Sequence, residues 1–162
     1  MMHSPDHRLS MKIKAILLAC AMGGGLLAPA AMAGAPQGVW LIDGEAAVQI
    51  FDCEGMLCGR VLFLESPHDP QGVLKRDKRN PDQALREREL CGLNVIWGLR
   101  PTGSDNWDDG RFYNPDSGQT YDVKMTLTAP DTLEARFYQG ASFLGQTKTL
   151  SRIARGTSKG WC

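Results

Sequence analysis

The sequence predicts an all-β protein, an antiparallel up-and-down barrel of about eight strands with one short helix in an insertion. Between residues 38 and 153, short segments alternate apolar and polar side chains, and glycine, proline, asparagine and aspartate separate them. This is the pattern of strands joined by hairpins. One stretch, residues 65–89, interrupts the pattern. An open sheet would expose two unpaired edges, so we favour a closed barrel over the alternative, a two-sheet sandwich.

The first 33 residues predict export. Lys12 and Lys14 precede an apolar segment, residues 15–30, and Ala31-Met32-Ala33 places small residues before a cleavage position. This order is typical of a cleaved secretory signal peptide, residues 1–33. The apolar segment of about 16 residues, broken by glycines and a proline, is short for a membrane span of about 20. Cys20 follows Lys14 too closely for a lipoprotein signal, so we expect no lipid anchoring. We also expect no transmembrane segment in the mature chain.

The rest of the chain is expected to form one barrel domain, residues 34–154, followed by a C-terminal tail, residues 155–162. The signal peptide places this domain in the periplasm. Lysine and arginine together number 18, as do aspartate and glutamate, so the formal net charge is 0. A balanced charge without a basic cluster argues against a nucleic-acid partner.

Four cysteines follow the signal peptide: Cys53, Cys58, Cys91 and Cys162. In an exported protein an even number of cysteines predicts disulfides. Cys53 and Cys58 flank a turn, so their pairing is favoured among the three possible connectivities. Elimination leaves Cys91 with Cys162, and this second bond stays open. No second cysteine pair or histidine lies at zinc-like spacing, so we expect no metal site.

The first three strands are expected before the interruption. Residues 38–42 form the first, Asp43-Gly44 is a strong hairpin turn, and residues 46–53 form the second. The third follows Cys58 and runs to residue 64. In it Val61 and Phe63 should share one face and Leu62 the other, so both faces are expected to be covered for part of its length.

The interrupting stretch predicts a short helix over about residues 81–88. Asn80 would cap it and Pro81 would occupy its first position, which proline tolerates. The stretch is expected to be a lid or an edge cover. If Arg86 or Arg88 packed against Asp77, the insertion would be fixed in place; we favour a solvated, charged helix instead.

The remaining strands follow the insertion. In residues 90–100, Leu93, Val95 and Trp97 are expected on one face. The strand from residue 121 to 128 has the cleanest alternation, with an apolar inner face and a polar outer face. The other expected strands cover residues 107–113, 133–137 and 146–153.

A series of short motifs spans nearly the whole mature chain. It comprises Gly38-Val39-Trp40, Cys53-Glu54, Leu57-Cys58-Gly59-Arg60, Asp77, Asn80-Pro81-Asp82, Leu85-Arg86-Glu87-Arg88, Trp107-Asp108-Asp109-Gly110, Tyr113-Asn114-Pro115, Gly118 to Tyr121 and Gly145-Gln146-Thr147. In order and spacing these motifs resemble the bacterial exported family called domain of unknown function 2147. The resemblance implies a lipocalin-like or fatty-acid-binding-protein-like barrel without an established activity. It also implies barrel closure by Trp40, packed under Arg152, beside Gly38. Where the family usually has glycine, this chain has Asp109.

No residue set predicts catalysis. Ser66, His68 and Asp69 lie within four positions of one proline-rich loop, where the three side chains of a triad cannot easily meet. Four aspartates near Trp107 are the alternative, as an acid–base pair of a carboxylate-based hydrolase or as calcium ligands. We interpret them as turn formers. The four are Asp105, Asp108, Asp109 and Asp116.

Aromatic side chains supply the candidate ligand site. They either line an apolar cavity or fill the core, and the sequence leaves both interpretations open. We therefore predict that the barrel binds a small apolar, amphipathic or lipid-like ligand without cofactor or catalysis. The alternative, besides the hydrolase, is an interaction module with a filled barrel whose loops bind envelope proteins or glycans. The candidate ligand-binding residues are Trp97, Trp107, Tyr113, Tyr121, Phe137 and Arg86.

Overall fold

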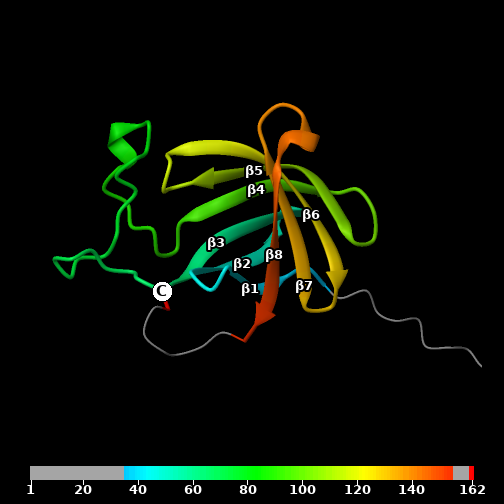
Figure 1. Ribbon diagram of the computed structural model, residues 1–162, viewed down its shortest axis with the longest axis horizontal. Coiled ribbons are helices and arrows are strands. Elements are labelled where there is room, and N and C mark those ends of the chain that lie inside the picture. Colours follow the sequence, from blue (N-terminus) through cyan, green and yellow to red (C-terminus); the bar gives the residue numbers. More distant parts are fainter. Residues whose placement is uncertain (1–34, 155–160) are drawn as a thin grey trace, which may run out of the picture. The chain divides into compact units, whose positions relative to one another are not determined.

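The computed structural model describes residues 35–154 and 161–162. Eight antiparallel strands, each paired with its neighbours in sequence and the last with the first, form a closed barrel (Figure 1). The prediction of an eight-stranded up-and-down barrel is confirmed. The expected signal peptide and Cys20 lie outside the described residues, so export remains a prediction. The strands are β1 (Gly38–Ile42), β2 (Ala46–Cys53), β3 (Met56–Leu64), β4 (Asn94–Pro101), β5 (Asn106–Asn114), β6 (Gln119–Ala129), β7 (Thr132–Tyr138) and β8 (Gln146–Ile153).

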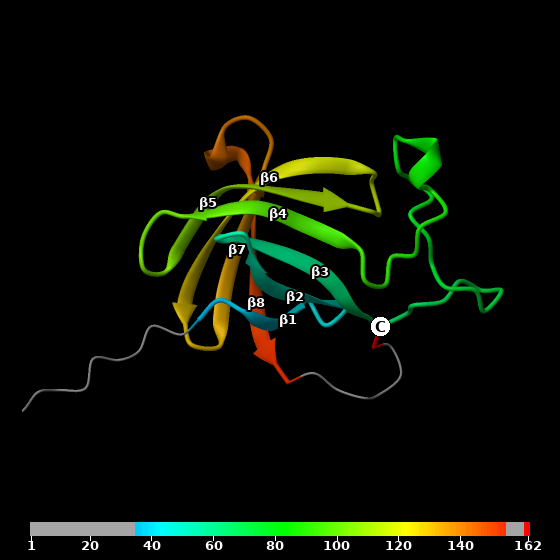
Figure 2. The ribbon, with the colours of Figure 1, turned by 180° about the vertical axis from the view of Figure 1, so that it is seen from behind.

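The strand order gives the barrel two distinct ends. At one end lie the β2–β3, β4–β5 and β6–β7 turns and the start of β1; we call it the closed end. At the other, the open end, lie the β1–β2 and β5–β6 turns, the β7–β8 connection and residues 65–93 between β3 and β4. Figure 2 shows this long connection leaving the barrel beyond β3 and returning into β4.

The β2–β3 hairpin is tighter than the sequence suggests. Its loop holds only Glu54 and Gly55, with φ of 60° and 79°. Two successive positive φ angles give the turn whose twist matches the flanking strands. Cys53 and Cys58 form a disulfide across the hairpin. They are not directly opposite each other, because Cys53 pairs with Met56 and Cys58 pairs with Phe51 in the strand register.

At the closed end, Arg152 covers Trp40. Its guanidinium carbon lies 4.2 Å from the ring centroid of the fully buried indole, and the two residues are paired between β1 and β8. Arg152 also donates to the carbonyls of Gln37 and Pro130, and Trp40 Nε1 donates to the carbonyl of Pro36 at 2.8 Å. A cation–π contact contributes about 0.5–2 kcal/mol. Gly38 lets the guanidinium approach, since a Cβ there would stand 2.4 Å from Arg152 Nη1.

Bulges change the predicted inward faces of two strands. In β3, Ala47 pairs with Phe63 and Val48 with Val61, so Leu62 is an extra residue and Phe63 faces the opposite side from Val61. In β4, Gly59 pairs with Ile96 and Arg60 with Asn94, so Val95 is an extra residue: Val95 and Ile96 are both buried and Trp97 faces outward. The expectation that Val61 and Phe63 share a face is therefore wrong. So is the expectation that Trp97 shares the face of Leu93 and Val95, because Trp97 is 41% exposed.

Outer residues of β1, β2 and β3 form a second, smaller apolar cluster. Val39, Ala47 and Leu62 are buried there, and Trp161 packs on them with its ring 5.5 Å from that of Phe63. The N–H of Cys162 donates to the carbonyl of Leu62, and Cys162 forms a disulfide with Cys91. The bond left open by the sequence is therefore present, and β3 is covered on both faces as expected.

The short helix predicted over residues 81–88 is present only in part. Only a 3-10 turn, η1 (Gln83–Leu85), forms, and its cap is Asp82, whose carboxylate accepts from the N–H of Ala84. Asn80, the expected cap, is instead 4% exposed, and its side chain accepts from the N–H of Asp82 while it donates into a buried cluster. The oxygen of Asn80 thus makes a cap-type bond, while its amide nitrogen joins this segment to the buried cluster.

Candidate functional site

The open half of the barrel contains a cavity of about 630 Å³. A cavity of this size lies within the range that small-molecule sites occupy. Below it, towards the closed end, the interior is filled by buried side chains that include Trp40, Leu99, Met125 and Leu133. The barrel is thus solid in its lower half and hollow in its upper half. The two interpretations of the aromatic residues, cavity wall and core, each hold for one half.

The cavity has an apolar wall and a polar rim. At the rim Lys148 is bonded to Asp43 at 2.7 Å, which raises the pKa of the lysine through that hydrogen bond first and its charge second. Glu45 and Asp116 stand at the same rim. The apolar wall is formed by Ile42, Ala46, Val48, Val61, Leu64, Leu90, Val95, Phe112, Tyr121, Phe137 and Leu144.

Of the candidate ligand-binding residues, Tyr121 and Phe137 line the cavity. With Phe112 they form an aromatic cluster in the wall: the Phe112 ring lies 4.6 Å from that of Phe137 and 6.4 Å from that of Tyr121. The sequence analysis did not select Phe112. Phe112 lies two residues after Gly110, and residues two apart share a face of a strand. That face is the inner one, since a side chain at Gly110 would meet Leu99 and Val123 in the core. This spacing is the signal that the sequence offered.

The other candidates lie elsewhere. Trp107 is buried in the filled half, and Trp97 is on the outside of β4. Tyr113 is buried under the insertion, and Arg86 donates to the carbonyl of Asn80 at 2.7 Å; neither lines the cavity. These four residues are therefore removed from the candidate site.

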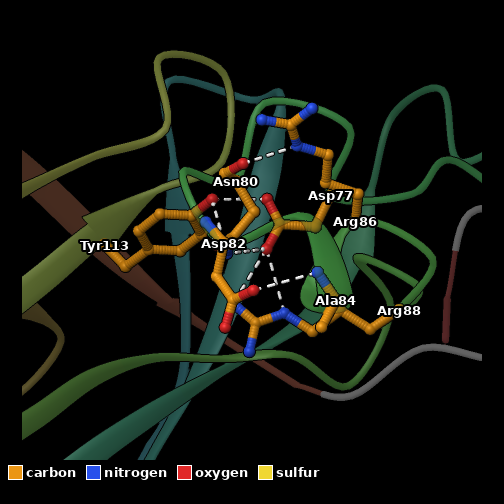
Figure 3. Close-up of polar contacts among 7 residues, drawn as sticks. All are labelled: Asp77, Asn80, Asp82, Ala84, Arg86, Arg88 and Tyr113. Carbon is orange, nitrogen blue, oxygen red and sulfur yellow. Dashed lines mark hydrogen bonds and ion pairs between the residues drawn. The ribbon is translucent and has the colours of Figure 1, made fainter.

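Tyr113 instead belongs to a buried polar cluster that attaches the insertion to β5 (Figure 3). At its centre is the carboxylate of Asp77, which is fully buried. Tyr113 donates to Asp77 Oδ1 at 2.5 Å, while Asn80 and Arg88 donate to Oδ2 at 2.8 and 2.9 Å. Arg88 also lies over the Tyr113 ring. A buried carboxylate is tolerated because these donors replace water.

Two arrangements were expected for the insertion: a charged helix in solvent, or a segment fixed by an arginine packed on Asp77. Arg88 is ion-paired with Asp77, so the charged helix free in solvent is wrong and the fixed insertion is right. Burial, followed by the bond to Asp77, raises the pKa of Tyr113 to about 12. The insertion also packs closely on the β5–β6 turn, where a Cβ on Gly118 would stand 2.0 Å from the carbonyl oxygen of Arg79. Of residues 65–93 only Leu90 lines the cavity, so the insertion is not a lid. It is not an edge cover either, because the closed barrel has no free edge; it packs on β5 and on the β5–β6 turn.

The acidic residues near Trp107 do not assemble into one site. Asp105, Asp108 and Asp109 lie at the start of β5, and Asp116 follows its other end. Asp109 has φ 60° beside a bulge, a conformation that aspartate tolerates and glycine favours. His68 is exposed. Among the described residues no three His, Cys, Asp or Glu side chains are grouped to hold a metal ion. None of the helices in this part is long and apolar enough to cross a membrane.

A closed eight-stranded antiparallel barrel with a cavity at one end is the architecture of the lipocalin-like class. The chain belongs to the family described as uncharacterized protein conserved in bacteria (DUF2147), whose model matches residues 38–152. Among solved structures it is similar to protein HP1028 from Helicobacter pylori, which is described as belonging to the lipocalin family. The TM-score is 0.63 and the identity 24%, over 75% of this chain and 84% of that one, a likeness that shows the fold. No curated protein matches the sequence.

Proposed function

We propose that this protein binds a small apolar or amphipathic molecule in the cavity of its barrel, in the periplasm and without catalysis. The observation that carries the proposal is the cavity itself, about 630 Å³ with an apolar wall and a charged rim. Side chains normally fill the interior of a small barrel, as they do in the lower half of this one. An empty cavity of this size therefore supports a ligand site. The alternative function, an interaction module, assumes a filled barrel, and the cavity argues against that assumption.

The periplasmic part of the proposal rests on two observations. Lys12, Lys14 and the apolar segment after them have the order of a secretory signal. Both disulfides of the structure belong to a type of bond that persists in oxidising compartments. Detection of the mature protein in an osmotic-shock fraction, with its N-terminus at Gly34, would be the expected result. A protein retained in the cytoplasm with its first 33 residues intact would contradict it.

Ligand binding is tested by native mass spectrometry of the protein purified from cells that express the full chain. We expect a co-purifying adduct that organic solvent extracts, and saturable binding of a fluorescent fatty alcohol to the extracted protein. Ala46→Trp places an indole in the wall of the cavity and should abolish both signals. Ala84→Trp is the matched control, because Ala84 is exposed on the η1 turn and not in the cavity wall.

The outcomes separate cleanly. Loss of binding in Ala46→Trp with retention in Ala84→Trp supports the cavity as the site, provided that both variants keep the thermal midpoint of the unmodified protein. If the unmodified protein carries no adduct and the fatty alcohol does not bind saturably, the proposed function is wrong. Equal binding by both tryptophan variants would place the ligand outside the cavity.

A further inference from the structure

The β7–β8 connection exposes two large apolar side chains beside the mouth of the cavity. It contains a 3-10 turn, η2 (Ser142–Leu144), in which Phe143 is 79% and Leu144 is 74% exposed. These are the highest values among the large apolar residues of the described chain. Leu144 also lines the cavity, so the exposed pair and the cavity meet at one residue. We call Phe143 and Leu144 the apolar tip.

The backbone beneath the tip is held in place. Arg136, on β7, donates from Nε to the carbonyl of Ser142 at 2.6 Å and from Nη2 to the carbonyl of Phe143 at 3.0 Å. Its Nη1 donates to the hydroxyl of Thr147 at 2.9 Å, across the connection. At the end of the turn, a Cβ on Gly145 would stand 2.4 Å from the carbonyl oxygen of Phe137. The two apolar side chains are therefore presented outward by an ordered turn.

The tip is too small for a protein interface. A stable interface buries about 800 Å² on each partner, and the chain on both sides of the tip is polar or small: Gln139, Gly140, Ala141 and Ser142 before it, Gly145 and Gln146 after it. A lipid bilayer sets no such requirement. Apolar side chains enter the boundary between head groups and acyl chains without a complementary surface.

We propose that Phe143 and Leu144 insert into the surface of a lipid bilayer, with the mouth of the barrel towards the lipid. The inference goes beyond ligand binding and does not depend on it. Charge contributes little to this contact. Asp43, Glu45 and Asp116 at the mouth are matched by Lys148 at the same rim and by two arginines beside it, Arg79 on the carbonyl of Asp116 and Arg136 under the tip. Binding should therefore depend on the apolar tip and only weakly on lipid charge.

Co-sedimentation with sucrose-loaded vesicles tests the inference, with the protein purified from cells that express the full chain. We expect binding to phosphatidylcholine vesicles, and a roughly tenfold weaker partition for Phe143→Ser and again for Leu144→Ser, since each removes a largely exposed apolar side chain. Val73→Ser is the matched control, because Val73 is also exposed, at 49%, but lies on the insertion. It should change nothing. Adding phosphatidylglycerol or 0.5 M salt should alter binding by less than about twofold.

Several results would overturn the inference. They are no sedimentation with either vesicle, an equal loss in Val73→Ser, and a concentration-dependent dimer that Phe143→Ser abolishes. Reduced binding of the fatty alcohol by Phe143→Ser without a change in vesicle binding would likewise overturn it, by assigning the tip to the ligand site. Ala46→Trp keeps the outcome separate from that of the ligand proposal: with the cavity filled, vesicle binding should persist.

Discussion

Replacing Tyr113 by phenylalanine removes one oxygen from the polar cluster and keeps the ring. The hydroxyl donates to Asp77 Oδ1, and no other hydrogen bond to that oxygen is present among the described residues. Oδ2 keeps its bonds to Asn80 and Arg88. In Tyr113→Phe, therefore, the fully buried carboxylate keeps its contact with Arg88 but has one oxygen without a donor.

The size of the effect follows from the charge of the acceptor. A hydrogen bond to a charged group contributes about 1.5–3 kcal/mol, and an orphaned buried group bears its full desolvation cost. We expect the free energy of unfolding to fall by about 2–3 kcal/mol. For a domain of this size each kcal/mol lowers the thermal midpoint by about 4 °C, so the decrease should be about 8–12 °C.

Tyr121→Phe is the matched control for this experiment. Within residues 35–154, the Tyr121 hydroxyl bonds only to the exposed side chain of Gln119, at 3.3 Å. Chemical unfolding followed by circular dichroism, with both disulfides intact, should show Tyr121→Phe within about 0.5 kcal/mol of the unmodified protein. The reasoning is refuted if Tyr113→Phe is equally harmless. A double-mutant cycle with Asp77→Asn adds a check, because residues in one network should give a non-additive sum.

Three other predictions concern stability. Gly38→Ala should lower the free energy of unfolding by about 2 kcal/mol or more, because the new Cβ meets Arg152 Nη1, and the measurement is the same denaturation curve; an unchanged midpoint would mean that Arg152 moves aside freely. Cys162→Ser should cost about 4 kcal/mol and Cys58→Ser about 2, since their bonds close sequence separations of 71 and 5 residues; the reverse order would contradict the chain-entropy account. Because the pKa of Tyr113 is raised to about 12 in the folded state, the unfolded chain loses that proton first above pH 10, and stability should fall by up to about 1.4 kcal/mol per pH unit between pH 10 and 12. In Tyr113→Phe that part of the pH dependence should be absent.

The strands were predictable because their signal is local. Val123, Met125 and Leu127 alternate with polar residues, and the structure buries all three. The Asp43-Gly44 turn likewise has two positive φ angles that the residue types favour. Period-two alternation and turn chemistry depend only on neighbours in sequence, so they survive without knowledge of the rest of the fold.

The errors arose where contacts distant in sequence decide the local structure. Asn80 has the residue type of a helix cap, and its oxygen does accept from the N–H of Asp82. Its amide nitrogen, however, donates to Asp77 and to Tyr113, which is 33 positions away, and only a 3-10 turn follows. Trp97 follows the apolar alternation on paper, but a bulge against β3 turns it outward. Whether the barrel was hollow could not be read from the aromatic residues, because a wall and a core have the same composition. Register and bulges determine which of the two each ring joins.

The bond between Cys91 and Cys162 also divides the chain into two mechanical parts. It joins the end of the insertion to the tail, so β4 to β8 lie within one covalent loop and β1 to β3 lie outside it. A force that pulls on Ala35 and Cys162 passes through this bond and leaves the residues between the two cysteines, 92–161, without tension. At about 3.5 Å per extended residue, the loop withholds roughly 250 Å of contour length until the bond is reduced. Stretched between Ala35 and Cys162, the oxidised protein therefore extends only the part before Cys91, which holds β1 to β3 and most of the insertion.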